Sequence, residues 1–150
     1  MAELREYPRI RCRLTVAFEL VRWDERDLDQ VHDPTVMRSY DISASGLRLQ
    51  GPAPIKPRDL KRLMRGVRKI RMAVYLNDSD PPLLTFARLI WTDDTTATEP
   101  AVLRLLRARG RRSARGPVQL GFSFISVREP VFDTLLQYVG DRLDEEGQAG

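Results

Sequence analysis

An acidic residue, a hydroxyl and a glycine that could together bind a ligand lie close together in the stretch YDISASG at residues 40–46. The Asp41 carboxylate accepts hydrogen bonds, and the Ser43 hydroxyl donates or accepts them. Gly46 allows backbone conformations that other residues avoid. This grouping is typical of a polar turn, but it also suits the N–H edge of a bound base, and the short motif alone does not separate the two interpretations.

Arginine supplies most of the positive charge of this chain, which has 150 residues and a formal net charge of +4. A guanidinium is a planar fork of donors that grips a phosphate or a purine edge in two places. Arg5 and Arg9 lie four residues apart near the N-terminus, and Arg11 and Arg13 follow them. The same spacing recurs elsewhere in the chain by chance alone, and a general bias toward arginine codons explains the arginine content equally well.

Metal, disulfide and catalytic chemistry are not expected from this composition. The chain has one cysteine, Cys12, and one histidine, His32, so it cannot form an internal disulfide or a Cys/His zinc site. No nucleophile is paired with a base, and we therefore predict no catalytic residues, no metal and no enzyme. Arginines around Cys12 would lower the pKa of its thiol, but we favour a buried, unreactive cysteine.

Membrane insertion and secretion are also not expected. No segment reaches the roughly 20 apolar residues of a membrane-spanning helix. The N-terminal sequence MAELREYPRIR lacks the apolar stretch of a signal peptide. The sequence therefore predicts a cytoplasmic protein.

Hydrophobic periodicity predicts a mainly β domain. Apolar residues alternate over 14–20, which predicts a first strand, and a second strand is predicted over 38–50 around the motif. A short helix is predicted at 57–65, because it begins with proline and stops before Gly66. Further strands are predicted at 69–76, 83–91 and 118–127, with a weaker candidate in 101–109.

The C-terminal segment has helical spacing from about 130 to 145, and this helix is expected to cover the open side of a small antiparallel barrel. We expect a single domain over 1–150, with the barrel at about 12–128. The acidic segment 23–37 and the basic stretch 104–116 are predicted to be long loops and are candidate partner contacts.

The order and spacing of these features resemble the PilZ domain family over roughly residues 5–138. An arginine pair precedes the first strand, Asp41-x-Ser43-x-x-Gly46 follows about thirty residues later, and a final strand containing LGFSF leads into the helix. The resemblance implies a six-stranded barrel of bacterial origin, and the short helix predicted at 57–65 lies between the second and third predicted strands. It also implies binding of the second messenger cyclic di-GMP without any further cofactor. The binding residues that it implies are Arg5, Arg9, Asp41, Ser43 and Gly46.

The resemblance extends to a flexible N-terminal segment, here 1–11, that would fold over the ligand and alter a partner-binding surface. Trp91 matches an aromatic residue found in some family members and could stack on a base, although packing is the favoured interpretation. Arg13 is a further candidate in place of Arg5. Leu4 stands where many family members have another arginine, which leaves one or two ligand molecules per site open.

Two other functions stay open from the sequence. The first is a PilZ-like adaptor that binds protein but no nucleotide, with its motif serving only as a turn. The second is a small basic barrel that binds nucleic acid, for which RARGRRSAR at 107–115 is the only support. This stretch lacks the interleaved aromatic residues on which single-stranded nucleic acids stack, so we rank it last.

Overall fold

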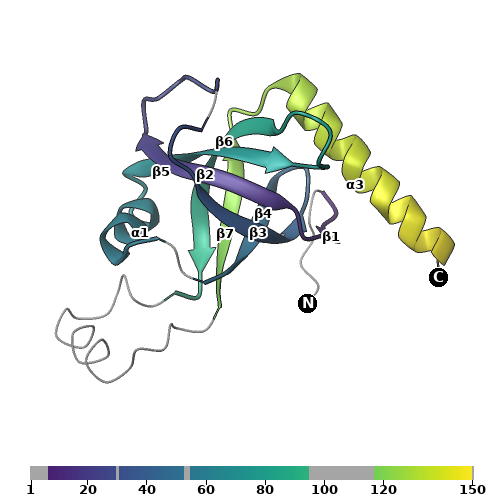
Figure 1. Ribbon diagram of the computed structural model, residues 1–150, viewed down its shortest axis with the longest axis horizontal. Coiled ribbons are helices and arrows are strands. Elements are labelled where there is room, and N and C mark those ends of the chain that lie inside the picture. Colours follow the sequence, from purple (N-terminus) through teal and green to yellow (C-terminus); the bar gives the residue numbers. More distant parts are fainter. Residues whose placement is uncertain (1–6, 30, 53–54, 95–116, 150) are drawn as a thin grey trace.

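The computed structural model of the chain describes residues 7–29, 31–52, 55–94 and 117–149. Within them, seven strands and two helices follow one another along the chain (Figure 1). The strands are β1 (Ile10–Arg11), β2 (Thr15–Arg22), β3 (Thr35–Ile42), β4 (Gly46–Gly51), β5 (Arg68–Tyr75), β6 (Leu83–Thr92) and β7 (Val118–Ile125). The helices are α1 (Pro57–Met64) and α3 (Glu129–Ala149).

Six of the strands form a closed antiparallel barrel, as predicted. The sheet order is β1-β3-β2-β5-β6-β7-β4, and an additional pairing of β3 with β4 closes the barrel. The short outer strand β1 continues along the side of β3 that β2 occupies, with Ile10 opposite Ile42 and Arg11 opposite Asp41. The weak strand candidate in 101–109 lies outside the described residues.

The prediction of one strand over 38–50 is wrong, because this stretch is a hairpin. β3 ends at Ile42 and β4 begins at Gly46, and the motif residues between them form the turn. The Ser43 N–H donates to the Gly46 carbonyl oxygen at 2.8 Å, and the Phe124 N–H of β7 donates to the Ser45 carbonyl oxygen at 2.9 Å. These bonds satisfy the backbone where the chain reverses, so Ser43 lies in the turn, while Asp41 lies near the end of β3 and Gly46 begins β4.

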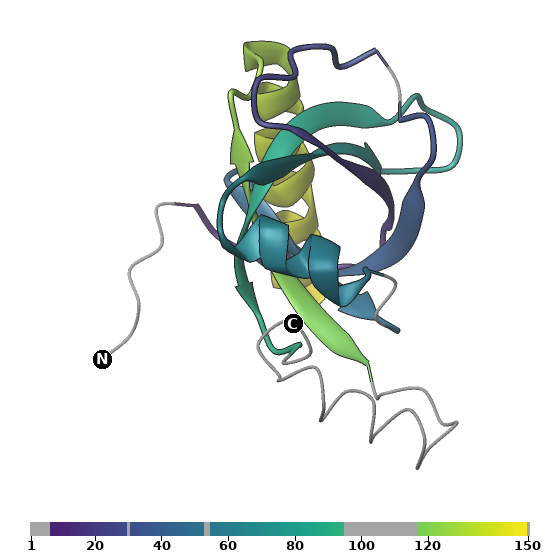
Figure 2. The same ribbon diagram turned by 90° about the vertical axis from the view of Figure 1, so that its left-hand side faces the viewer.

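The two helices lie on opposite sides of the barrel (Figures 1 and 2). Helix α1 buries Leu60 and Leu63 in the core, and α3 buries Leu135 and Val139, which confirms the predicted covering helix. The first helix ends as predicted beside Gly66, whose φ of 74° is in the left-handed region that favours glycine. No helix of the described segments is long and apolar enough to cross a membrane.

The acidic loop after β2 packs on the outside of the barrel. Leu28 forms a small second core with Val21 and Phe86. Lys69 donates to the Glu25 carbonyl oxygen at 2.6 Å, and Arg71 donates to the Asp27 carbonyl oxygen. The loop ends at residue 34 rather than 37, because β3 already begins at Thr35.

Candidate ligand-binding site

A bulge in β3 places Tyr40 beside the motif carboxylate of Asp41 on the outer face of the barrel. Ser39 lies opposite the buried Leu49, but the next paired residue is Asp41, opposite Arg48, so Tyr40 is the extra residue. A bulge changes the alternation of inward and outward side chains along a strand. As a result Tyr40 and Asp41, which are neighbours in sequence, both lie against Arg48.

The strand register aligns the candidate residues in one row across five strands. Arg11 is opposite Asp41, Asp41 is opposite Arg48, Arg48 is opposite Gly121, and Gly121 is opposite Trp91. A Cβ placed on Gly121 would lie 3.6 Å from Cβ of Trp91 and 3.7 Å from its Cε3, so the indole lies beside the glycine. Trp91 is 47% exposed, and core packing therefore does not account for it.

The carboxylate of Asp41 lies between two guanidinium groups, although its residue is only 5% exposed. Arg48 Nη2 donates to Asp41 Oδ2 at 2.5 Å, and Arg9 Nη1 lies 3.9 Å from Oδ1. A buried carboxylate is costly unless it is paired, so these two arginines explain how Asp41 is accommodated. Arg9 and Asp41, which come from the two separate motifs, are thus brought together.

Tyr40 holds two further cationic contacts next to this carboxylate. The guanidinium carbon of Arg11 lies 4.5 Å from the centre of the Tyr40 ring, and that of Arg48 lies 5.0 Å away. Arg11 also donates a hydrogen bond to the Tyr40 hydroxyl. Cations are attracted to the face of an aromatic ring, so Tyr40 helps to gather positive charge around Asp41.

Ser43 and Gly46 are fully engaged by the turn itself. Ser43 is completely buried; its hydroxyl accepts from the Ser45 N–H at 3.2 Å and donates to the Gly46 carbonyl oxygen at 3.4 Å. A Cβ on Gly46 would lie 2.2 Å from the carbonyl oxygen of Phe122, which leaves no space for a side chain. Both residue types are therefore required by local packing, whether or not a ligand touches them.

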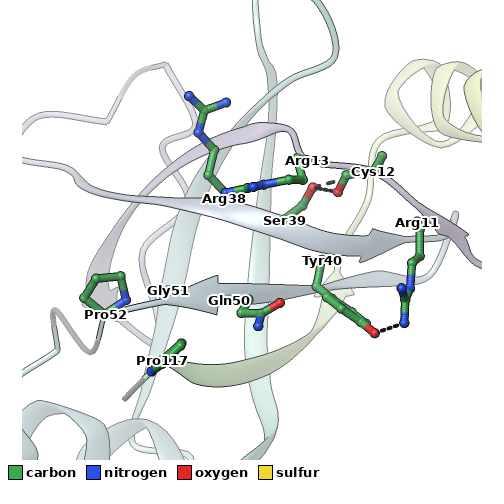
Figure 3. A pocket seen from close by; sticks show the side chains of 10 residues that line it. All are labelled: Arg11, Cys12, Arg13, Arg38, Ser39, Tyr40, Gln50, Gly51, Pro52 and Pro117. Carbon is green, nitrogen blue, oxygen red and sulfur yellow. Dashed lines mark hydrogen bonds between the residues drawn. The ribbon is translucent and has the colours of Figure 1, made fainter. Parts of the chain in front are cut away.

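A hollow of about 550 Å³ lies beside the row and is lined by Arg11 of the row and by the neighbouring Tyr40 (Figure 3). Its lining also includes Arg13 and Arg38, together with Pro52 and Pro117. Arg13, a secondary candidate from the sequence, thus borders the hollow and not the Asp41 carboxylate. Arg5 and the basic stretch 104–116 lie outside the described residues.

Cys12 is buried, as predicted, and is 8% exposed. Its sulfur lies 3.7 Å from the Ser39 hydroxyl oxygen. Burial raises the pKa of the thiol above its usual value and outweighs the opposing effects of the Ser39 contact and of Arg142. A thiol with a raised pKa carries little thiolate at neutral pH, which is the reverse of an activated nucleophile.

Sequence reasoning missed Arg48, Tyr40 and Arg11 as neighbours of the motif carboxylate. A turn assigned to residues 43–46 would have predicted Arg48 as a neighbour of Asp41, because a hairpin centred there places Arg48 across from Asp41. The predicted continuous strand concealed this pairing. The bulge that adds Tyr40 to the cluster has no comparable local signal.

Comparison with known proteins gives a match at the level of structure. No family model and no curated protein matches the chain. The PilZ domain of YcgR from Escherichia coli, solved with c-di-GMP, superposes with a TM-score of 0.53 at 16% identity, over 98% of this chain and 96% of that one. The chain has a PilZ-like fold.

Two longer proteins contain the same PilZ-like fold. The Bacillus subtilis inhibitor of motility, MotI/DgrA, matches with a TM-score of 0.60 at 14% identity over 95% of this chain. MrkH of K. pneumonia, solved as a c-di-GMP complex, matches with a TM-score of 0.58 at 12% identity over 99% of this chain. The PilZ-like chain spans about half of each, 53% and 56%.

Proposed function

We propose that this PilZ-like chain is a bacterial receptor for cyclic di-GMP and not an enzyme. The observation that carries the proposal is the meeting of Arg9 with Asp41 at 3.9 Å, on the outer face of the barrel. These residues belong to separate sequence motifs, and each was assigned to the ligand by the resemblance. Two of the structures with this fold, YcgR and MrkH, were solved with c-di-GMP, which supports the choice of ligand.

The chemistry of the row, together with Arg9 beside Asp41, suits a ligand that carries two phosphates and two guanines. Arg9 and Arg11 offer forked donors for phosphate oxygens or for guanine O6 and N7. Asp41 offers a carboxylate oxygen to a guanine N–H. The exposed indole of Trp91 lies on the same row and offers a face on which a base can stack.

Mutation of the arginine pair tests the receptor function directly. Arg5→Ala and Arg9→Ala should each weaken cyclic di-GMP binding at least tenfold, about 1.4 kcal/mol, because each removes charge-assisted bonds. Isothermal titration calorimetry measures this, with GTP as the control ligand. Arg22→Ala is the matched control variant, because Arg22 is a highly exposed arginine on β2 whose side chain pairs with the exposed Asp24. Unchanged binding by both variants would contradict the assignment.

We further propose that ligand binding orders the segment that carries Arg5 and Arg9 and thereby changes a surface seen by a protein partner. The segment that could become ordered ends before Ile10. Ile10 and Arg11 already pair with β3, and Ile10 is buried. Tyr7 contacts Phe132 of α3 edge to face, with ring centres 5.5 Å apart, so a change at the segment would reach this helix.

Amide hydrogen exchange tests the ordering. Residues 4–9 should gain protection when cyclic di-GMP is added, while β5 should stay unchanged and serves as the internal standard. Residues 10–12 should be protected in both states, because the Cys12 N–H donates to the Tyr40 carbonyl oxygen and β1 pairs with β3. Protection of 4–9 without ligand, or none at saturation, would show that this segment does not transmit binding.

One observation favours the adaptor as a second candidate function. Ser43 and Gly46 are explained by the turn alone, as the hydroxyl bonds of Ser43 and the 2.2 Å approach at Gly46 show. A protein that keeps these residues for folding need not bind a nucleotide. Calorimetry decides between the two candidates, because the adaptor shows no heat of binding with cyclic di-GMP.

A further inference from the structure

Two buried side-chain polar atoms among the described residues lack a hydrogen-bond partner, and both belong to one ion pair. They are Oδ1 of Asp41 and Nε of Arg48, whose residues are already joined through Oδ2 and Nη2. Leaving a buried polar atom unsatisfied costs free energy, so such atoms are rare and each requires an explanation. Of the two atoms, Oδ1 of Asp41 is the hydrogen-bond acceptor that an incoming ligand N–H could complete.

The two arginines beside Asp41 are held very differently. Arg48 is on β4, between β3 and β7, and is held by its bond to Asp41, by Gln119 at 3.4 Å and by the ring of Tyr40. Arg9 precedes the two-residue strand β1, and its guanidinium lies 3.9 Å from Oδ1, beyond hydrogen-bond distance. A base that approaches Oδ1 would therefore displace Arg9 and leave the Arg48 contact intact.

We propose that Arg48 is a positioning residue that sets base selectivity through Asp41, an inference that rests on the proposed receptor function. By holding Oδ2, Arg48 fixes the carboxylate so that Oδ1 is left to accept from a guanine N–H once Arg9 moves to a phosphate. Arg48 also offsets the negative charge of Asp41, which would otherwise repel the two phosphates of the ligand. This residue is outside the two motifs that the resemblance supplies.

Two substitutions separate the charge of Arg48 from its geometry. Arg48→Gln removes the charge, and we expect about a tenfold loss of cyclic di-GMP affinity with a clear fall in the preference for cyclic di-GMP over cyclic di-AMP. Arg48→Lys keeps the charge without the planar fork, so it should recover part of the affinity. Arg22→Gln is the control, because it makes the same change on an exposed arginine. Thermal unfolding of each variant shows that binding is compared between folded proteins.

A double-mutant cycle then shows whether Arg48 acts through Asp41. Arg48→Gln introduced into Asp41→Ala should cause no further loss of selectivity. Additive losses would mean that Arg48 contacts the ligand independently, and they would overturn the positioning role. Unchanged or increased affinity in Arg48→Gln would overturn it as well.

The same titrations keep the two proposals distinguishable. If the parent chain does not bind cyclic di-GMP, the receptor function fails, and the role of Arg48 fails with it. If the parent binds and Arg48→Gln binds equally with the same selectivity, only the role of Arg48 fails. Partial recovery by Arg48→Lys, together with a non-additive cycle, supports both.

Discussion

Replacement of Gly46 by alanine should lower the free energy of unfolding by about 3 kcal/mol, at the upper end of the cost of overpacking. The added Cβ would lie 2.2 Å from the Phe122 carbonyl oxygen, which is backbone and cannot turn away as a side chain could. The carbonyl oxygen of Gly46 also accepts a hydrogen bond from the Ser43 N–H, and the carbonyl oxygen of Ser45 beside it accepts one from the Phe124 N–H. A displacement at Gly46 would therefore disturb both the hairpin turn and the seam between β4 and β7.

Urea unfolding measures this loss, and Gly51→Ala at the other end of β4 is the matched control. A Cβ on Gly51 would lie 3.6 Å from the Met37 side chain, an ordinary contact, so its effect should stay within about 0.5 kcal/mol. Equal stabilities for the two variants would show that the backbone at Gly46 adapts at little cost. Any loss of ligand binding in Gly46→Ala must be corrected for the unfolded fraction before it is assigned to the site.

Asp41→Ala should abolish most cyclic di-GMP binding, with a loss of about a hundredfold, or roughly 2.8 kcal/mol. The substitution removes the acceptor for a guanine N–H, and it leaves Arg48 without its 2.5 Å partner beside the site. Truncating one member of a desolvated charge pair commonly costs several kcal/mol, much of which comes from the unpaired partner. The loss should be larger for cyclic di-GMP than for cyclic di-AMP, because adenine does not place the same N–H groups there.

Paired titrations with the two cyclic dinucleotides give the selectivity, which is the more informative measurement. Asp24→Ala is the control, because it removes the same charge from a highly exposed carboxylate. Equal losses for both ligands would mean that Asp41 acts by holding Arg48 and not by contacting the base. No loss for either ligand would remove Asp41 from the binding site.

Local chemistry made much of the fold predictable from the sequence. Alternation over 14–20 and 69–76 predicted β2 and β5, because a strand exposes its two faces alternately. Proline at the start and Gly66 after the end predicted α1. The apolar spacing after Pro130 predicted the covering helix α3. These signals depend on neighbours in the chain, so one sequence is enough to recognise them.

The motif residues were also visible in the sequence, but their surroundings were not. Asp41, Ser43 and Gly46 stood out by type and spacing, and the resemblance assigned them to a ligand. The structure shows that Ser43 and Gly46 are required by the turn, because the backbone of β7 passes directly against Gly46. That approach joins segments more than seventy residues apart, and no local pattern carries it.

Strand register decided the rest of the site. The pairing of β3 with β4 places Asp41 opposite Arg48, and the bulge adds Tyr40 beside them. The pairings of β4, β7 and β6 extend the row through Gly121 to Trp91. A shift of one residue would move every side chain of a strand to the opposite face, and apolar alternation does not reveal where a bulge interrupts it. The sequence by itself therefore determined which elements form and which residues could bind a ligand. Only the tertiary structure decided which of them face one another, because that choice depends on hydrogen bonds between strands that are distant in the chain.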